Sequence, residues 1–192
     1  MTSSTISISL PAWVENYAAT YRPSLDVEVR MAFIIAAAER NAVEQTGGPF
    51  AAGVFALGSG ELLALGVNLV ASRRLSILHA EIVALTLAQE RLDSFDLGRD
   101  GAGYELVTSS EPCAMCYGAI PWSGVRQVVT GAFVADACRI GFDEGPRPKE
   151  WEEELEVRGV KVISGVLRNQ AAAVLDAYAA AGGEIYHPRG GK

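Results

Sequence analysis

Two short stretches, far apart along the chain, carry side chains that fit one metal ion. The first is His79-Ala80-Glu81, and the second is Pro112-Cys113-Ala114-Met115-Cys116. Cysteines at i and i+3 lie on one face of a helical turn, so both sulfurs can converge on a single ion with His79 as a third ligand. Any fold of this chain that forms the site must therefore bring residue 79 next to residues 113 and 116.

The remaining sequence is that of an ordinary globular protein. It has 192 residues, of which 49% are hydrophobic and 20% are charged, and this balance favours a packed core over disorder. No segment approaches the roughly 20 uncharged apolar residues that a membrane span needs. The N-terminus also lacks the basic and apolar regions of a secretory signal. We therefore expect a cytoplasmic protein with no membrane partner.

Charge and cysteine usage narrow the classes of function. Two of the three cysteines stand three residues apart, which in a reducing compartment favours a metal or catalytic role over a disulfide framework. The formal net charge of -7 disfavours a nucleic-acid partner, because nucleic-acid recognition depends on dense Lys and Arg contacts to phosphate. A small neutral substrate fits this composition better.

Hydrophobic periodicity predicts an alternation of helices and strands. We expect helices at about 26–46, 79–92, 113–120, 135–140, 149–158 and 168–181, and strands at 51–57, 62–69, 104–108, 125–130 and 160–163. The glycine-rich loop 58–61 predicts an antiparallel pair for the first two strands. The strand-helix-strand order after residue 104 predicts a parallel pair.

The expected fold class is α/β, with a three-layer α/β/α arrangement around a five-stranded mixed sheet. The metal site would lie at the N-termini of the helices that begin near residues 79 and 113. Residues 1–25 are expected to form an N-terminal arm, residues 26–183 the metal-binding domain, and residues 184–192 a C-terminal tail.

The predicted ligand set favours a catalytic zinc site. Three protein ligands on a normally tetrahedral Zn²⁺ leave one position for water, and the ion lowers the pKa of that water from 15.7 to about 7. Glu81 is the candidate for a carboxylate that leaves the metal free and moves protons, first as base and then as acid. A redox pair or half of a zinc ribbon would also contain C-x-x-C, but the chain has no second C-x-x-C.

The two stretches match the H-x-E and P-C-x-x-C signature of zinc deaminases, and residues 27 to 186 resemble the cytidine deaminase-like superfamily. Within it the chain is most similar to bacterial guanine deaminases, including those that also act on triazines such as ammeline. Besides Asn68, the resemblance rests on Gly48-Pro49-Phe50-Ala51-Ala52, where Ala51 replaces the usual glycine, on Pro121-Trp122-Ser123, and on Gly141-Phe142-Asp143-Glu144.

The resemblance implies roles for five further residues. Asn68 would hydrogen-bond the ring edge of the substrate, and Glu144 would assist proton transfer to the leaving amine. Phe50 would form an apolar wall against a flat base, the backbone of Ala80 would hold a ring carbonyl, and Trp122 would contact the substrate. As alternatives, Asn68 could cap a turn, Trp122 could belong to the core, and Glu144 could lie on an exposed loop.

The leading hypothesis is hydrolysis of guanine to xanthine and ammonia, with a side activity on ammeline. Cytosine, isocytosine, guanosine and cytidine remain alternative substrates. A tRNA adenosine deaminase is disfavoured because the chain has no basic stripe, and a zinc-stabilised module without turnover is the alternative from another class. The resemblance also implies one Zn²⁺ per chain, a homodimer, and a tail at about 186–191 that closes its own active site or a partner's.

Overall fold

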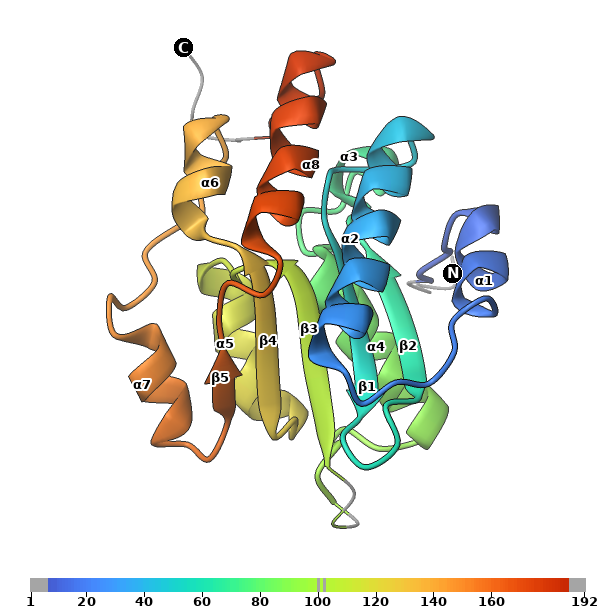
Figure 1. Ribbon diagram of the computed structural model, residues 1–192, viewed down its shortest axis with the longest axis vertical. Coiled ribbons are helices and arrows are strands. Elements are labelled where there is room, and N and C mark those ends of the chain that lie inside the picture. Colours follow the sequence, from blue (N-terminus) through green and yellow to red (C-terminus); the bar gives the residue numbers. More distant parts are fainter. Residues whose placement is uncertain (1–6, 100, 102, 187–192) are drawn as a thin grey trace, which may run out of the picture.

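Five strands form one mixed sheet in the computed structural model, which describes residues 7–99, 101 and 103–186 (Figure 1). In the order β2-β1-β3-β4-β5, the strands are β2 (Leu62–Val67), β1 (Ala51–Ala56), β3 (Tyr104–Ser110), β4 (Gln127–Ala132) and β5 (Lys161–Ile163). β1 pairs antiparallel with β2 and with β3, whereas β3, β4 and β5 run parallel. The antiparallel and parallel pairs predicted from the sequence are both confirmed.

Helices cover both faces of this sheet. α2 (Val27–Val43) and α8 (Arg168–Ala180) pack on one face, and α4 (Ala80–Leu92) and α5 (Ala114–Ser123) lie on the other (Figure 1). The shorter helices are α1 (Ala12–Ala18), α3 (Val70–Arg73), α6 (Val134–Arg139) and α7 (Trp151–Glu156). The expected three-layer α/β/α fold is confirmed.

Two hydrophobic cores form because successive strand residues point to opposite faces of a sheet. Val107 and Val129 belong to the core beneath α2 and α8, whereas their neighbours Leu106 and Val128 belong to the core beneath α4 and α5. All four side chains are fully buried. Strands buried on both faces read as continuous apolar runs, which is the pattern of parallel strands in α/β proteins.

Two helices were not predicted from the sequence. α1 forms inside the expected N-terminal arm, where Trp13 and Val14 pack into the core beneath α2. α3 lies between the strand expected at 62–69 and the helix expected at 79–92, and its C-cap residue Arg74 has a φ of 57°. Neither helix is long enough to show a hydrophobic period, and helices this short depend on tertiary packing for their stability.

The expected tail at 184–192 is described only as far as Tyr186, so residues 187–192 lie outside the described residues. Within the described part of the chain, no helix is long and apolar enough to cross a membrane.

Close approach of α4 to β2 depends on one glycine. A Cβ atom on Gly66 would lie 2.4 Å from the Ala80 carbonyl oxygen and 2.4 Å from the Ala84 amide nitrogen. Both contacts are to backbone, so a side chain at residue 66 would displace the first turn of α4, which contains Glu81. This glycine therefore sets the depth at which that turn sits on the sheet.

We expect Gly66→Ala to lower the free energy of unfolding by about 1–3 kcal/mol, the usual cost of overpacking a core, as measured by urea denaturation. Gly58→Ala is the matched control, because a Cβ there meets nothing within 4 Å; its effect should stay within about 0.5 kcal/mol. Equal effects of the two substitutions would contradict the close-packing account.

Candidate metal centre and active site

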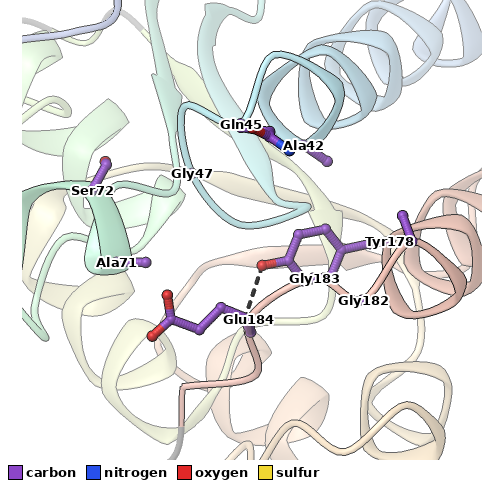
Figure 2. A pocket seen from close by; sticks show the side chains of 10 residues that line it. Ala42, Gln45, Gly47, Ala71, Ser72, Tyr178, Gly182, Gly183 and Glu184 are labelled. Carbon is purple, nitrogen blue, oxygen red and sulfur yellow. Dashed lines mark hydrogen bonds between the residues drawn. The ribbon is translucent and has the colours of Figure 1, made fainter.

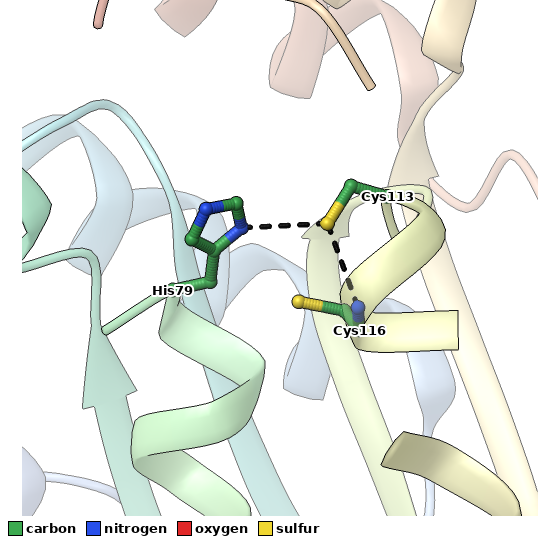
Figure 3. Close-up of side chains that lie close together, drawn as sticks. All are labelled: His79, Cys113 and Cys116. Atoms are coloured by element: carbon green, nitrogen blue, oxygen red, sulfur yellow. Dashed lines mark hydrogen bonds between the residues drawn. The ribbon is translucent and has the colours of Figure 1, made fainter. Parts of the chain in front are cut away.

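Three potential metal ligands meet where the N-termini of α4 and α5 face each other (Figure 3). His79 is the N-cap residue of α4, Cys113 is the N-cap residue of α5, and Cys116 lies in the first turn of α5. Their ligand atoms all lie within 4.8 Å of one another. The structure thus brings together the three residues that the sequence motifs single out.

The spacing of these atoms fits zinc. Sulfur and nitrogen ligands bind Zn²⁺ at about 2.3 Å and 2.0–2.1 Å, so two of them on a tetrahedral ion lie about 3.5 Å apart. Cys113 Sγ lies 3.5 Å from His79 Nδ1. Within the described part of the chain, this group contains three side chains that could bind a metal ion. Three is the number of protein ligands in a catalytic zinc site.

The electrostatics of α5 favour a thiolate at Cys113. A hydrogen bond from the Cys116 thiol, together with His79, lowers the pKa of Cys113 to about 4 even though burial opposes this. The backbone N–H of Cys116 also points at Cys113 Sγ, at 3.5 Å, as helix N-terminal amides do for anions. The same thiol–thiolate hydrogen bond and burial raise the pKa of Cys116; a coordinated divalent cation would deprotonate it.

His79 is protonated more readily than an isolated imidazole. Its burial opposes the charged form, but the sulfur of Cys113 and the carboxyl groups of Glu81 and Glu144 outweigh that effect and raise the pKa of His79. This negative surrounding would equally attract a cation held between His79 and the two sulfurs.

Glu81 lies in the first turn of α4, beside the ligands. Its side chain is 6% exposed and makes a hydrogen bond with the Cys116 thiol. Burial raises the pKa of Glu81 to about 7, and negative charge on Cys113 adds to the effect. A carboxyl group with a pKa near neutrality can both accept and release a proton, which suits a general acid-base catalyst.

Glu144 supplies a second carboxyl group from the loop between α6 and α7. Burial raises the pKa of Glu144 to about 8, and the charges of Cys113 and Glu81 add to this. The backbone carbonyl of Glu144 accepts a 2.8 Å hydrogen bond from the Ala114 N–H at the start of α5. The loop is exposed at Asp143 and Gly145, whereas Glu144 itself is half-buried.

A cavity of about 20 Å³ joins these groups, and its lining residues are Phe50, Asn68, His79, Glu81, Ser110, Glu111, Cys113, Glu144 and Tyr186. One ordered water needs about 10–15 Å³, so this conformation is closed to a purine base. Sequence reasoning missed Ser110 and Glu111; the available signal was their position directly before the cysteine motif.

Tyr186 covers the cavity from the C-terminal segment. Its hydroxyl accepts a 2.7 Å hydrogen bond from Asn68 Nδ2, and burial raises the pKa of Tyr186, which keeps the hydroxyl protonated. The ring of Tyr186 lies edge-on to the rings of His79 and Phe142, at centroid distances of 6.0 and 5.3 Å. The described end of the tail thus covers the site of its own chain. The rest of the predicted closing segment, 187–191, lies outside the described residues.

Two residues expected to contact substrate do not line the cavity. Ala80 is fully buried behind it, at the first position of α4. Trp122 is 85% exposed near the end of α5, nine residues beyond Cys113, or about 13 Å along a helix axis. Trp122 therefore does not contact the cavity within one chain, because the zinc ligands are at the opposite end of the helix. Its exposure shows that it does not belong to the core either.

A buried amide holds Asn68, which lines the cavity, in place. Asn41 Nδ2 donates to the carbonyls of Gly48 and Asn68, at 2.8 and 2.9 Å. Its Oδ1 accepts from the Thr46 hydroxyl at 2.8 Å, and Thr46 Oγ1 accepts from Trp13 Nε1 at 3.1 Å. The N-terminal arm is thereby tied, through Thr46 and Asn41, to two segments that line the cavity.

A second hollow, of about 370 Å³, lies beside the turn that leads to Tyr186 (Figure 2). It is lined by Ala42, Gln45, Gly47, Ala71, Ser72, Tyr178, Ala181, Gly182, Gly183 and Glu184. The turn is held by a 2.9 Å hydrogen bond from the Tyr178 hydroxyl to the Glu184 carbonyl. This side of the C-terminal segment is therefore loosely packed.

Comparison with known proteins identifies relatives of the chain. Residues 26–132 match the cytidine and deoxycytidylate deaminase zinc-binding region. The chain is 35% identical over 114 residues to guanine deaminase of Bacillus subtilis (strain 168), covering 59% of this chain and 69% of that protein. It is 33% identical over 120 residues to the tRNA-specific adenosine deaminase of the same organism, covering 62% of this chain and 70% of that protein.

A solved structure of guanine deaminase from Nitrosomonas europaea is similar over almost the whole chain. The identity is 45%, the TM-score is 0.89, and the match covers 94% of this chain and 99% of that one. The likeness therefore extends well beyond the zinc-binding region at 26–132.

We expect Asn41→Asp to lower the free energy of unfolding by about 2–4 kcal/mol, because a carboxylate would replace the buried amide that donates to two carbonyls. Zinc content per folded chain should be unchanged, since residue 41 contacts no ligand. Chemical denaturation and metal analysis check this. The exposed Asn169→Asp is the control, and a comparable loss of stability there would contradict a specific role for Asn41.

Proposed function

The chain belongs to the cytidine and deoxycytidylate deaminase family of zinc-dependent aminohydrolases, and from this premise we propose that it hydrolyses guanine to xanthine and ammonia. The observation that carries the proposal is the pair of buried carboxyl groups beside the three-ligand group, with the pKa of Glu81 raised to about 7 and that of Glu144 to about 8. Similarity to two guanine deaminases supports the choice of base.

His79, Cys113 and Cys116 would hold the zinc ion, which would supply an acidified water. Glu81 would take a proton from the attacking water as the water oxygen bonds to the ring carbon that carries the amine. Glu81 then delivers the proton to the adjacent ring nitrogen. A group with a pKa near 7 performs both transfers with little penalty in either direction.

Glu144 acts as the general acid for the leaving amine. Burial raises the pKa of this carboxyl group, which favours its protonated form. It donates this proton to the exocyclic nitrogen as the carbon–nitrogen bond breaks, and it recovers one from the hydroxyl group newly attached to the ring carbon. The overall balance is guanine plus water giving xanthine plus ammonia.

Three further residues would orient the base. The amide of Asn68 offers a donor and an acceptor to the ring edge. Phe50 provides an apolar wall. Its ring is edge-on to that of Phe142, with the two ring centroids 5.0 Å apart. The N–H of Ala80, at the first position of α4, has no partner within the helix, and it would bind a ring carbonyl of the base. Trp122 has no role in this proposal for the site of its own chain.

Binding of a base requires Tyr186 to leave Asn68, because the closed cavity of about 20 Å³ does not accept a purine. The hollow beside residues 181–184 gives that segment space to withdraw. Return of Tyr186 would then exclude water from the bound base. Such a cover leaves no space for a ribose, which favours a free base over guanosine or cytidine.

We also propose that the protein acts in the cytoplasm, where its thiols stay reduced, without a nucleic-acid partner, and as a homodimer. Met115 and Trp122 stand seven residues apart, on one face of α5, and are 37% and 85% exposed. Exposed large apolar side chains of this kind are typical of interfaces. Sedimentation at micromolar concentration should give a dimer that Trp122→Asp weakens; a monomeric wild type would contradict the proposal.

Ammonia release from a panel of substrates tests the function. Zinc-loaded protein should release ammonia from guanine faster than from cytosine, isocytosine, adenine, guanosine, cytidine or ammeline, with xanthine as the product by chromatography. No release from guanine, together with fast release from another member, would contradict the substrate while keeping the zinc chemistry.

Three variants test the assigned roles in the same assay. Glu81→Gln should lower kcat by about 10³-fold or more, and Glu144→Gln by about 10²-fold, the range of general acid-base effects; both should retain zinc. His79→Ala should lose the metal and the activity together. Unchanged turnover in either glutamine variant would remove that residue from the mechanism, and activity that is absent from every variant and from the wild type would favour a non-catalytic zinc module.

A further inference from the structure

We propose that Glu111 and Arg147 are positioning residues that hold the Glu144 segment against the metal ligands; the inference rests on the proposed function of Glu144. The loop between α6 and α7, residues 140–150, contains no helix or strand. Proton transfer to a leaving group nevertheless requires placement to within about 0.5 Å. Side-chain contacts must therefore supply the rigidity that regular hydrogen bonding does not.

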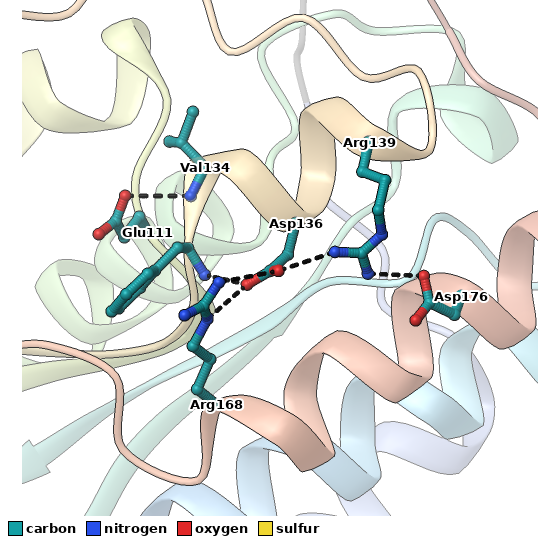
Figure 4. A network of polar contacts seen from close by, with 7 residues as sticks. Glu111, Val134, Asp136, Arg139, Arg168 and Asp176 are labelled. Atoms are coloured by element: carbon teal, nitrogen blue, oxygen red, sulfur yellow. Dashed lines mark hydrogen bonds and ion pairs between the residues drawn. The ribbon is translucent and has the colours of Figure 1, made fainter.

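One carboxylate oxygen contacts the chain on both sides of Glu144. Glu111 Oε2 accepts from the Val134 N–H at 3.0 Å, where α6 begins, and from Arg147 Nη2 at 2.9 Å, beyond Glu144 (Figure 4 shows the first contact). The side chains of Glu111 and Arg147 are only 11% and 12% exposed. An ion pair this buried is geometrically more restrictive than a surface pair.

Further contacts attach the same segment to the cysteine motif. Arg147 Nη1 donates to the Pro112 carbonyl at 2.9 Å, directly before the first cysteine. The guanidinium group also lies 4.3 Å from the ring centroid of Trp151, at the start of α7. With the hydrogen bond from Ala114 N–H to the Glu144 carbonyl, the segment is tied to residues 111–114 at three places.

A neighbouring network of ion pairs on α6 serves as a purely structural comparison. Asp136 binds Arg139 and Arg168, and Arg139 also binds Asp176 on α8 (Figure 4). The two arginines are half exposed, with side chains 51% and 42% accessible. This network joins α6 to α8, and none of its ion pairs involves the cysteine motif. Arg139 is therefore a matched control.

The expected consequence is a selective loss of turnover. A misplacement of about 1 Å can cost about 10²-fold in rate, so Arg147→Ala and Glu111→Gln should lower kcat for guanine by about 10- to 100-fold. KM should change less than about threefold, because Asn68 and Phe50 lie on other segments. Arg147→Lys keeps the positive charge but loses the contact through two nitrogen atoms. Its kcat should therefore lie between those of Arg147→Ala and the wild type. Arg139→Ala should leave kcat unchanged.

A double-mutant cycle in the full-length, zinc-loaded protein tests whether Arg147 acts through Glu144. In the Glu144→Gln background, Arg147→Ala should lower kcat less than twofold further. Equal fold-losses in the two backgrounds, or an unchanged kcat in Arg147→Ala, would overturn the proposal.

Hydrogen exchange followed by mass spectrometry supplies a readout that does not depend on activity. Peptides spanning 141–148 should exchange faster in Arg147→Ala and Arg147→Lys than in the wild type, with unchanged zinc content, whereas Arg139→Ala should leave them unchanged. Equal exchange in all proteins would overturn the positioning role. If the wild type does not deaminate guanine, the proposed function fails, and the exchange measurement still decides whether the pair holds the segment.

Discussion

The whole active site depends on two helix N-termini that face each other across the cavity. His79 and Cys113 are both N-cap residues, so the direction in which α4 and α5 leave the sheet decides whether their side chains can share one ion. Gly66 sets how closely α4 approaches β2. The orphan amides of a helix start also favour negative charge, which explains how a buried thiolate is tolerated at Cys113.

In the proposed function, substrate recognition and catalysis belong to separate parts of the chain around this centre. Asn68 and Phe50 belong to segments that Asn41 links to each other and to the N-terminal arm. Glu144 comes from the loop beyond α6, which Arg147 and Glu111 attach to the cysteine motif. A substitution in the arm and one in the loop should therefore alter different kinetic constants.

The order of the long helices and strands and the three metal ligands could be predicted from the sequence. Long elements show hydrophobic periodicity, and metal ligands have characteristic spacing. Both give local signals, as in the Cys113-x-x-Cys116 turn. α1 could not be predicted, because its two turns are stabilised by Trp13 packing on distant residues. The contact of Tyr186 with Asn68 spans 118 positions and leaves no local pattern. The resemblance predicts that Trp122 contacts the substrate, but Trp122 does not line the cavity of its own chain, because it lies near the far end of α5 from Cys113.

X-ray absorption at the zinc edge tests the central claim most directly, because it reports the atoms bound to the metal in solution. The account predicts one zinc ion per chain with two sulfur atoms at about 2.3 Å, one imidazole nitrogen at about 2.0–2.1 Å, and one oxygen atom from solvent in the fourth position. A third sulfur atom, or four protein ligands with no oxygen, would show a closed structural site and contradict a hydrolytic role for this centre.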